Sequence, residues 1–234
     1  MTTFRDRRKQ QTEAELRGIA SQHLHTEGAA ALSLRAIARD AGMAPSAVYR
    51  YFPSRDDLLT DLLVVAFTSH AESVEVAAQS FLDSGDPVAG LRAAMLAYRS
   101  WAVDHPAEFG LAYGTPVPGY RAPADRTLGP GTRIAAFLLG LLVACDQAGR
   151  LDKAVVRTRQ RRLGPAVKAQ LTAAGDALGY PVSPPLLALG LETLIRLHGF
   201  VSMEAFGQLA ATISDGAAYY DEVLSLELAR CGLT

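Results

Sequence analysis

The stretch that decides the fold runs from Leu32 to Leu58 and reads Leu-Ser-Leu-Arg-Ala-Ile-Ala-Arg-Asp-Ala-Gly-Met-Ala-Pro-Ser-Ala-Val-Tyr-Arg-Tyr-Phe-Pro-Ser-Arg-Asp-Asp-Leu. Ser33 is a candidate N-cap for a first helix, and Gly42 suits the left-handed backbone with which that helix would end. Pro45 fits the first turn of a second, shorter helix. Ala38 is small at the point where the two helices would cross, which allows the steep packing of a helix-turn-helix.

Further helices are expected on both sides of this motif. Residues 12–27 place apolar side chains at helical spacing, and Thr12 with Glu15 forms a candidate capping box. After the motif, Ser54 and Asp57 have the spacing that caps a long fourth helix. The motif therefore belongs to a compact helical unit rather than to an isolated hairpin.

The composition favours an all-α fold for the whole chain. It contains 40 Ala and 32 Leu but only 20 Ile and Val together, and Ala and Leu lose little side-chain freedom in a helix. Gly114 to Gly131 contains four Gly and four Pro within 18 residues and is predicted to be a loop. Helical patterns cover six further segments, namely 87–104, 106–113, 131–149, 151–178, 184–206 and 214–231.

Length, hydrophobicity and cysteine content exclude several classes of protein. With 234 residues, 49% of them hydrophobic, the chain can bury a sizeable core and is neither disordered nor fibrous. The longest apolar run, Ile134 to Cys145, has 12 residues, which is too short to cross a bilayer. The N-terminus does not resemble a signal peptide, and two cysteines cannot form a disulfide framework. We therefore expect a cytoplasmic protein without a membrane partner.

Charge divides the chain into two parts. Residues 1–55 contain nine Lys and Arg against five Asp and Glu, whereas the other 179 residues contain 14 basic and 19 acidic ones. A basic end on an acidic protein suggests a surface for a polyanion, although a solvated basic helix would look the same. We divide the chain into residues 1–55, with the helix-turn-helix at 33–52, and residues 56–234.

Residues 10 to 64 resemble the DNA-binding signature of TetR-type transcriptional repressors. The match rests on Ile37-Ala38, Gly42, Tyr49-x-x-Phe52 and Leu58. Two positions depart from the common pattern: Ala44 stands where Ser or Thr often caps the recognition helix, and Arg55 replaces the usual Lys. The resemblance implies a homodimer that binds a double-stranded DNA operator.

The same resemblance assigns roles in DNA binding. It implies that Arg50 reads guanine, because a guanidinium matches the O6 and N7 acceptors of that base. Tyr49 could instead be a packing residue, and Arg35 could simply be solvated. The residues implied to face base edges are Arg35, Pro45, Ser46, Ala47 and Arg50, and those implied to bind phosphates are Ser33, Tyr49, Tyr51 and Arg55.

Residues 56–234 are expected to form a helical domain for effector binding and dimerisation. The segments around Trp101 and His198-Gly199 resemble a C-terminal subclass named for a Trp-His-Gly pattern, although Leu194 stands where the Trp is expected. By resemblance, aromatic residues line an apolar pocket for a small-molecule effector, and the alternative is that they are core residues. The candidate contacts are Tyr98, Trp101, Phe109, Tyr113, Phe137 and His198.

The last two helical segments are candidates for the dimer interface. Ala217, Leu224 and Leu228 fall on one stripe of the segment 214–231. Two such helices from each subunit commonly form a four-helix bundle in TetR-like proteins. The same stripe could equally pack inside one subunit, a choice that periodicity alone does not make.

Enzymatic chemistry finds no support in the sequence. His-Glu-x-x-His, Cys-x-x-Cys and Gly-x-Ser-x-Gly motifs are absent, and His23 and His25 would point apart on a helix. We expect no cofactor and no metal. The favoured interpretation is a ligand-responsive repressor that a small, largely apolar effector releases from DNA. The alternative is an all-α small-molecule-binding or enzymatic module whose N-terminal helices make protein contacts.

Overall fold

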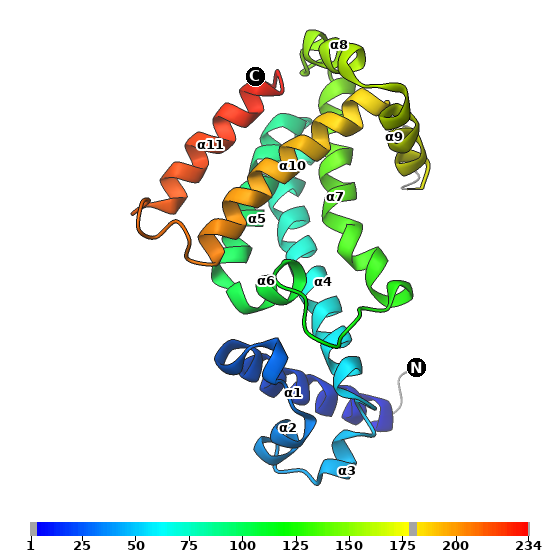
Figure 1. The fold of residues 1–234 in the computed structure, drawn as a ribbon, viewed down its shortest axis with the longest axis vertical. Helices are drawn as coiled ribbons and strands as arrows, with labels where there is room; N and C mark the ends of the chain where they lie inside the picture. The colour runs from blue at the N-terminus through cyan, green and yellow to red at the C-terminus, as the bar shows by residue number, and fades with distance from the viewer. Residues whose placement is uncertain (1–3, 178–181, 234) are drawn as a thin grey trace. The chain divides into compact units, whose positions relative to one another are not determined.

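The computed structural model describes residues 4–177 and 182–233, and α-helices are the main regular structure in these ranges (Figure 1). The predicted all-α fold is confirmed. The helices are α1 Phe4–Glu27, α2 Leu34–Asp40, α3 Pro45–Val48, α4 Arg55–Asp83, α5 Pro87–Asp104, α6 Pro106–Tyr113, α7 Ala124–Gln147, α8 Lys153–Arg162, α9 Pro165–Ala177, α10 Pro184–Ala205 and α11 Gly216–Arg230, with a short 3₁₀ turn at Ala29–Ala31.

The chain divides into two compact units. The first, here called the head, comprises the described residues up to Ser69 together with His105–Gly131. The second, here called the body, comprises His70–Asp104 and the described residues from Thr132 onward. Helices α4 and α7 each contribute residues to both units. The functional division at residue 55 stays a prediction.

The core of the head explains why the motif folds. Leu16 of α1, Ile37 of α2, Val48 of α3 and Leu58 of α4 are all buried in one apolar cluster. Ala38 is completely buried where α2 packs against its neighbours, as its small size predicts. Together these residues hold α2 and α3 in the helix-turn-helix arrangement.

The ends of the helices follow most of the predicted signals. Gly42 has a φ of 64°, the left-handed conformation expected after α2. The backbone N–H of Asp57 donates to Ser54 Oγ at 3.0 Å, so the predicted cap of α4 is confirmed. The capping box at Thr12 was wrong, because α1 begins at Phe4 and the Thr12 hydroxyl donates to the Arg8 carbonyl 3.1 Å away.

Helix α7 begins earlier than the sequence predicts. The segment from Gly114 to Gly131 was expected to be a loop throughout, yet α7 starts at Ala124 and includes Pro130. Pro130 lies inside this helix as its seventh residue, where it removes one backbone hydrogen bond but does not end the helix. Gly131 then lies against the ring of Phe67, where an added Cβ would be 3.3 Å from ring atoms.

The predicted helix over 151–178 is two helices in the structure. Helix α8 ends at Arg162, and Leu163 has extended backbone angles of −72° and 118°. Pro165 disfavours helical geometry in the residue before it, which separates α8 from α9.

In the body, α10 packs against α5, α8, α9 and α11. Arg99 of α5 forms a nearly buried ion pair with Glu204 of α10. The hydroxyl of Tyr220 donates to the carbonyl of Met95 at 3.1 Å, which ties α11 to α5. Leu224 and Leu228 of the predicted dimer stripe are buried within the subunit and form core, whereas Ala217 at the beginning of α11 is exposed.

Helices α7 and α10 are each long and apolar enough to cross a membrane. A third of the most apolar window of each helix is buried in the structure. Core helices of soluble proteins satisfy the same length and composition criteria, so this property by itself assigns no membrane role.

Candidate nucleic-acid interface and ligand cavity

The helix α3 presents one buried and one exposed side. Val48 is fully buried and anchors the helix to the head. Pro45, Ser46 and Arg50 are exposed, and Ala47 is half-buried. This arrangement lets short side chains and one long cation reach outward from a fixed backbone, as a recognition helix in a major groove requires.

The N-terminus of α3 lacks a side-chain cap. Ala44 occupies the N-cap position and has no oxygen to offer the first backbone N–H groups. Pro45 follows at the first helical position, where its fixed φ favours the helix and its missing N–H costs nothing. The departure at Ala44 therefore leaves backbone donors available at the end of α3.

The two tyrosines that flank Arg50 differ in environment. Tyr49 is 44% exposed, which leaves its hydroxyl available to an external partner. Tyr51 is half-buried and packs against the apolar cluster of the head. The packing interpretation that we raised for Tyr49 describes Tyr51 better.

On α2, Arg35 is exposed and Ser33 is half-buried. Ser33 occupies the predicted N-cap position, but its side chain makes no capping hydrogen bond. Its hydroxyl is therefore not committed to the helix end.

Arg55 contacts the backbone of the head. Its Nε donates to the carbonyl of Leu32 at 3.0 Å, and one terminal nitrogen donates to Ala29 and Ala30 at 2.9 Å. These three bonds join the beginning of α4 to the segment before α2. A phosphate contact by Arg55 stays a prediction, since its donors already have partners.

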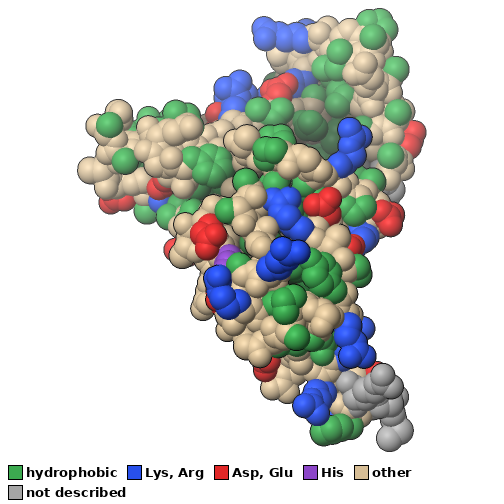
Figure 2. Space-filling model, turned by 60° about the horizontal axis from the view of Figure 1, so that its bottom comes forward, with side chains coloured by type: hydrophobic (Ala, Val, Ile, Leu, Met, Phe, Trp, Pro, Cys, Tyr) green, Lys and Arg blue, Asp and Glu red, His purple; other side chains and the backbone are tan. Residues whose placement is uncertain are grey.

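Basic side chains extend beyond the motif to the beginning of α1. Arg7, Arg8 and Lys9 are exposed on this helix. Figure 2 shows that, on the face in view, Lys and Arg side chains mostly stand apart from one another among hydrophobic and other side chains. The first 55 residues contain nine basic and five acidic residues, so their net positive charge is modest.

Hydrogen bonds between helices fix the geometry of the head, and sequence analysis missed them. His23 of α1 bonds Asp40 of α2 at 2.7 Å. Arg17 of α1 pairs with Asp61 of α4. The hydrogen bond from His23 is the main cause that lowers the pKa of Asp40, and Arg39 adds to it.

The carboxylate of Glu108 on α6 contacts two side chains of α1, and Ala107 and Leu111 of α6 pack against the apolar cluster of the head. Ser21 donates to Glu108 Oε1 at 2.7 Å, and His25 Nε2 lies 3.3 Å from Glu108 Oε2. The pattern of polar residues along α1 suggests that some of them have partners. It does not show that Ser21 and His25 contact Glu108.

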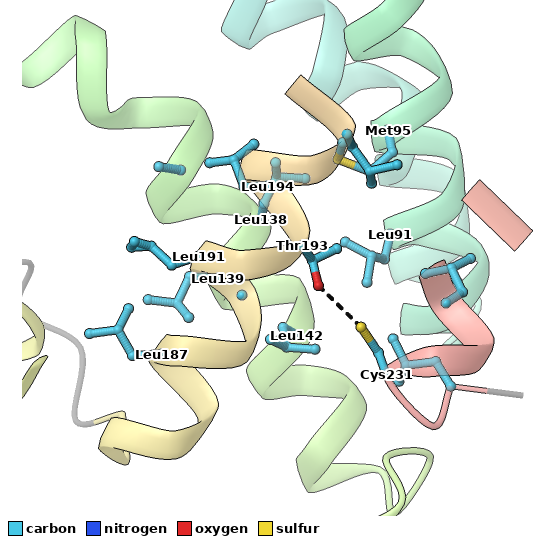
Figure 3. Close-up of a pocket in the computed structure, with 15 residues that line it drawn as sticks. Leu91, Met95, Leu138, Leu139, Leu142, Leu187, Leu191, Thr193, Leu194 and Cys231 are labelled. Carbon is cyan, nitrogen blue, oxygen red and sulfur yellow. Dashed lines mark hydrogen bonds between the residues drawn. The ribbon is translucent and has the colours of Figure 1, made fainter. Parts of the chain in front are cut away.

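The body contains an apolar cavity of about 110 Å³ (Figure 3). Leucines from four helices line it, among them Leu91 of α5, Leu138 of α7, Leu194 of α10 and Leu228 of α11. Thr193 and Cys231 supply the polar atoms of the wall and form a hydrogen bond of 3.1 Å, drawn as the dashed line. The cavity suits an apolar ligand, or the apolar part of one.

None of the six predicted effector contacts is among the residues that line this cavity. Phe109 and Tyr113 belong to the head, where their rings lie 5.0 Å apart. Tyr98 and Trp101 are buried core residues of α5, and Phe137 is half-buried on α7. The structure does not bring the six side chains together in one pocket.

His198 belongs to a hydrogen-bonded chain in the body. The Tyr98 hydroxyl lies 2.7 Å from His198 Nδ1, and Ser202 Oγ lies 3.2 Å from its Nε2. Burial lowers the pKa of His198, which favours the neutral ring. Beside this chain, the ring of His70 stacks on Trp101 with 4.3 Å between centroids.

Metal and thiol chemistry find little support in the described part of the chain. No group of three or more His, Cys, Asp or Glu side chains there could hold a metal ion. Burial raises the pKa of Cys145 to about 11 and also raises that of Cys231. Both thiols are therefore protonated at neutral pH and unreactive as nucleophiles.

Comparison with known proteins places both parts of the chain in one family. The family model described as "Bacterial regulatory proteins, tetR family" matches residues 20–62. A second model, "Tetracyclin repressor-like, C-terminal domain", matches residues 91–226.

Full-length relatives agree with these models. An HTH-type transcriptional regulator of Mycobacterium tuberculosis, Rv1816, is 36% identical over 217 residues, which are 91% of this chain and 89% of the relative. The crystal structure of the regulatory protein SCO4313 is 33% identical, covers 97% of this chain and 100% of its own, and has a TM-score of 0.77. PfmR of Thermus thermophilus shares the fold, with 16% identity over 92% of this chain and 97% of its own and a TM-score of 0.58.

The chain therefore belongs to the TetR family and is a transcriptional regulator with a helix-turn-helix DNA-binding domain. Members of this family are not enzymes. They bind DNA and typically dimerise.

Proposed function

We propose that this protein is a homodimeric repressor that binds a pseudo-palindromic operator and is released by a small, largely apolar effector. The observation that supports this most directly is α3 with the turn that follows it, where Val48 is buried while Pro45, Ser46 and Arg50 are exposed. Two such helices in a symmetric dimer would enter successive major grooves. The repressor would act in the cytoplasm, where its DNA is accessible.

Direct reading of bases would rest on few side chains. Arg50 would donate to guanine, while Ala47 and Pro45 would contact thymine methyl groups. Arg35 and Ser46 would add further contacts to base edges. Ser33, Tyr49 and Tyr51 would bind phosphates. Arg55 would attract phosphates by its positive charge while its guanidinium stays bonded to backbone carbonyls.

The dimer would form through exposed apolar side chains of α10 and α11. Ile195 and Met203 of α10 are exposed, as are Tyr219 and Leu226 of α11. Apolar surface of this kind on two neighbouring helices is costly to leave in water and is typical of protein interfaces. We assign the interface to these residues in place of Leu224 and Leu228.

The effector would enter the leucine-lined cavity of the body. A volume of about 110 Å³ is well below the roughly 300 to 1,000 Å³ of ordinary ligand pockets, so the cavity takes a small apolar group unless side chains move. A larger effector would extend toward Tyr98 and His198, which follow the lining residues Met95 and Leu197 along their helices. Trp101 and Phe137 of the body stay predicted effector contacts, and so, separately from this cavity, do Phe109 and Tyr113 of the head. The Trp-His-Gly subclass also stays a prediction.

The repressor proposal is tested by titrating the protein onto DNA from upstream of its own gene. Shuffled DNA of equal composition, at several salt concentrations, is the control. We expect saturable binding that prefers the upstream DNA and weakens steeply with salt as counterions are released. Absence of binding to either DNA at low salt would refute the proposal and favour a module that makes protein contacts.

A further inference from the structure

A second hollow in the body is lined by arginines rather than leucines. It lies between α8, α10 and α11 and includes Arg159 and Arg162 of α8, Arg196 of α10 and Arg230 of α11. Glu192 of α10 is the acidic residue in its wall. We call this hollow the arginine groove.

The acidic side chains nearby do not balance the charge of the groove. Arg159 donates to Glu192 Oε2 at 2.9 Å, and Arg230 pairs with Glu227 at 2.7 Å. Two carboxylates therefore face four guanidinium groups, which leaves a net charge of +2. Arg162 and Arg196 have no acidic partner within the described part of the chain.

Among the described residues, the Nε of Arg159 is a buried donor in the groove without a hydrogen bond. The same guanidinium bonds Glu192 through another nitrogen. A buried donor without an acceptor is energetically costly, because it has lost its hydrogen bond to water. An oxyanion in the groove would satisfy this nitrogen and the cations beside it at once.

From these observations, we propose that the arginine groove binds a phosphate-bearing small molecule. A phosphate monoester has a charge of about −1.5 to −2 at neutral pH, which matches the excess charge of the groove. Its oxygens would accept from Arg159, Arg162 and Arg196, since planar guanidinium groups fit phosphate geometry. Val155 and Leu163 form apolar wall that would receive the organic part.

The groove and the leucine-lined cavity are separate sites that share helices. On α10, Glu192 and Arg196 face the groove, while Leu187, Leu191 and Leu194 face the cavity. The groove belongs to the body and does not depend on DNA binding. A failure of the repressor proposal would therefore leave this inference standing.

The test uses isothermal titration calorimetry of the full chain with phenyl phosphate at constant ionic strength. We compare the wild type with the double variant Arg162→Ala/Arg196→Ala. The matched control is Arg157→Ala/Arg161→Ala, which removes two exposed arginines of α8 that lie outside the groove. Circular dichroism checks that all three proteins have the same helix content.

We expect saturable binding to the wild type, an affinity at least tenfold lower for the groove variant and an unchanged affinity for the control. Inorganic phosphate should bind more weakly than phenyl phosphate, because it lacks the apolar part. The proposal is overturned if the wild type gives no saturable heat. Equal losses in both double variants would also overturn it, since they would indicate general charge attraction.

Discussion

Arg55 has a structural role, whereas the sequence suggests only a contact with DNA. Its guanidinium donates to three backbone carbonyls at the 3₁₀ turn and at Leu32. Lysine, the residue usually found at this position in the family that the sequence resembles, has no planar fork with which to make such a set of bonds. Arg55 thereby orients the beginning of α4 relative to the segment before α2.

Replacing Arg55 with Ala should destabilise the head. Loss of charge-assisted hydrogen bonds to half-buried carbonyls costs about 1.5 to 3 kcal/mol. Urea unfolding followed by circular dichroism measures the change. Arg35→Ala is the control, because that side chain is exposed, and equal stabilities of the two variants would contradict a structural role for Arg55.

The lowered pKa of Asp40 makes the stability of the head depend on pH. Its pKa is lowered in the folded protein, mainly by the hydrogen bond from His23. The interaction therefore stabilises the folded state above the unfolded pKa of about 3.9 and is lost as the pH falls through the lower folded value. Asp40→Asn should make the unfolding midpoint less sensitive to pH below about 4. An unchanged acid profile in thermal melts would show that Asp40 does not contribute.

At the scale of helices, sequence patterns predicted local signals well. Gly42, Ser54 and Pro106 mark boundaries that the structure retains, because caps and glycine turns depend on adjacent residues. The start of α7 was missed because the Gly and Pro residues from Gly114 to Gly131 were all assigned to a loop, whereas α7 includes Pro130 and loses one backbone hydrogen bond there.

The cavity could not be located from sequence. Aromatic residues attracted the ligand prediction, yet the cavity wall consists of leucines that look like any core. Which leucines surround empty space depends on how α5, α7, α10 and α11 pack, and periodicity does not encode that. The useful signal was the apolar run Ile134–Cys145, which supplies four of the lining residues, Ala135, Leu138, Leu139 and Leu142.

A charge introduced on the exposed side of α10 should disrupt the proposed dimer. Ile195 is 65% exposed, so Ile195→Asp should leave the subunit folded and yield monomers in light scattering. Val76→Asp is the matched control on α4, because Val76 is 75% exposed and lies outside α10 and α11. A dimeric mass for the Ile195 variant would remove this side of α10 from the interface.

Filling the cavity should abolish the binding of small apolar molecules. An added Cβ at Gly190 would lie 3.3 Å from a methyl group of Leu142, so Gly190→Val places its side chain in the cavity. Benzene should raise the melting temperature of the wild type but not of this variant. Gly140→Val is the control, since a side chain there meets open space. Equal shifts in all three proteins would show that benzene binds elsewhere.

At the scale of the whole molecule, α4 and α7 each belong to both the head and the body. A movement of these helices caused by an effector would therefore reach the DNA-binding unit through continuous backbone. Such coupling is typically about 1 to 3 kcal/mol, and it is reciprocal, so operator DNA must weaken effector binding by the same factor. Mutual weakening of effector and operator binding by the same factor is what allosteric release requires.

The most direct test of the account compares the affinities of wild type and Arg50→Ala for the operator and for shuffled DNA. Fluorescence anisotropy at one salt concentration gives the four dissociation constants, with Arg121→Ala as a control that removes an exposed charge outside the motif. We expect Arg50→Ala to lose about 1 to 3 kcal/mol of binding free energy on the operator and little on shuffled DNA. Equal losses on both DNAs, or none on either, would contradict the central claim that α3 reads the sequence.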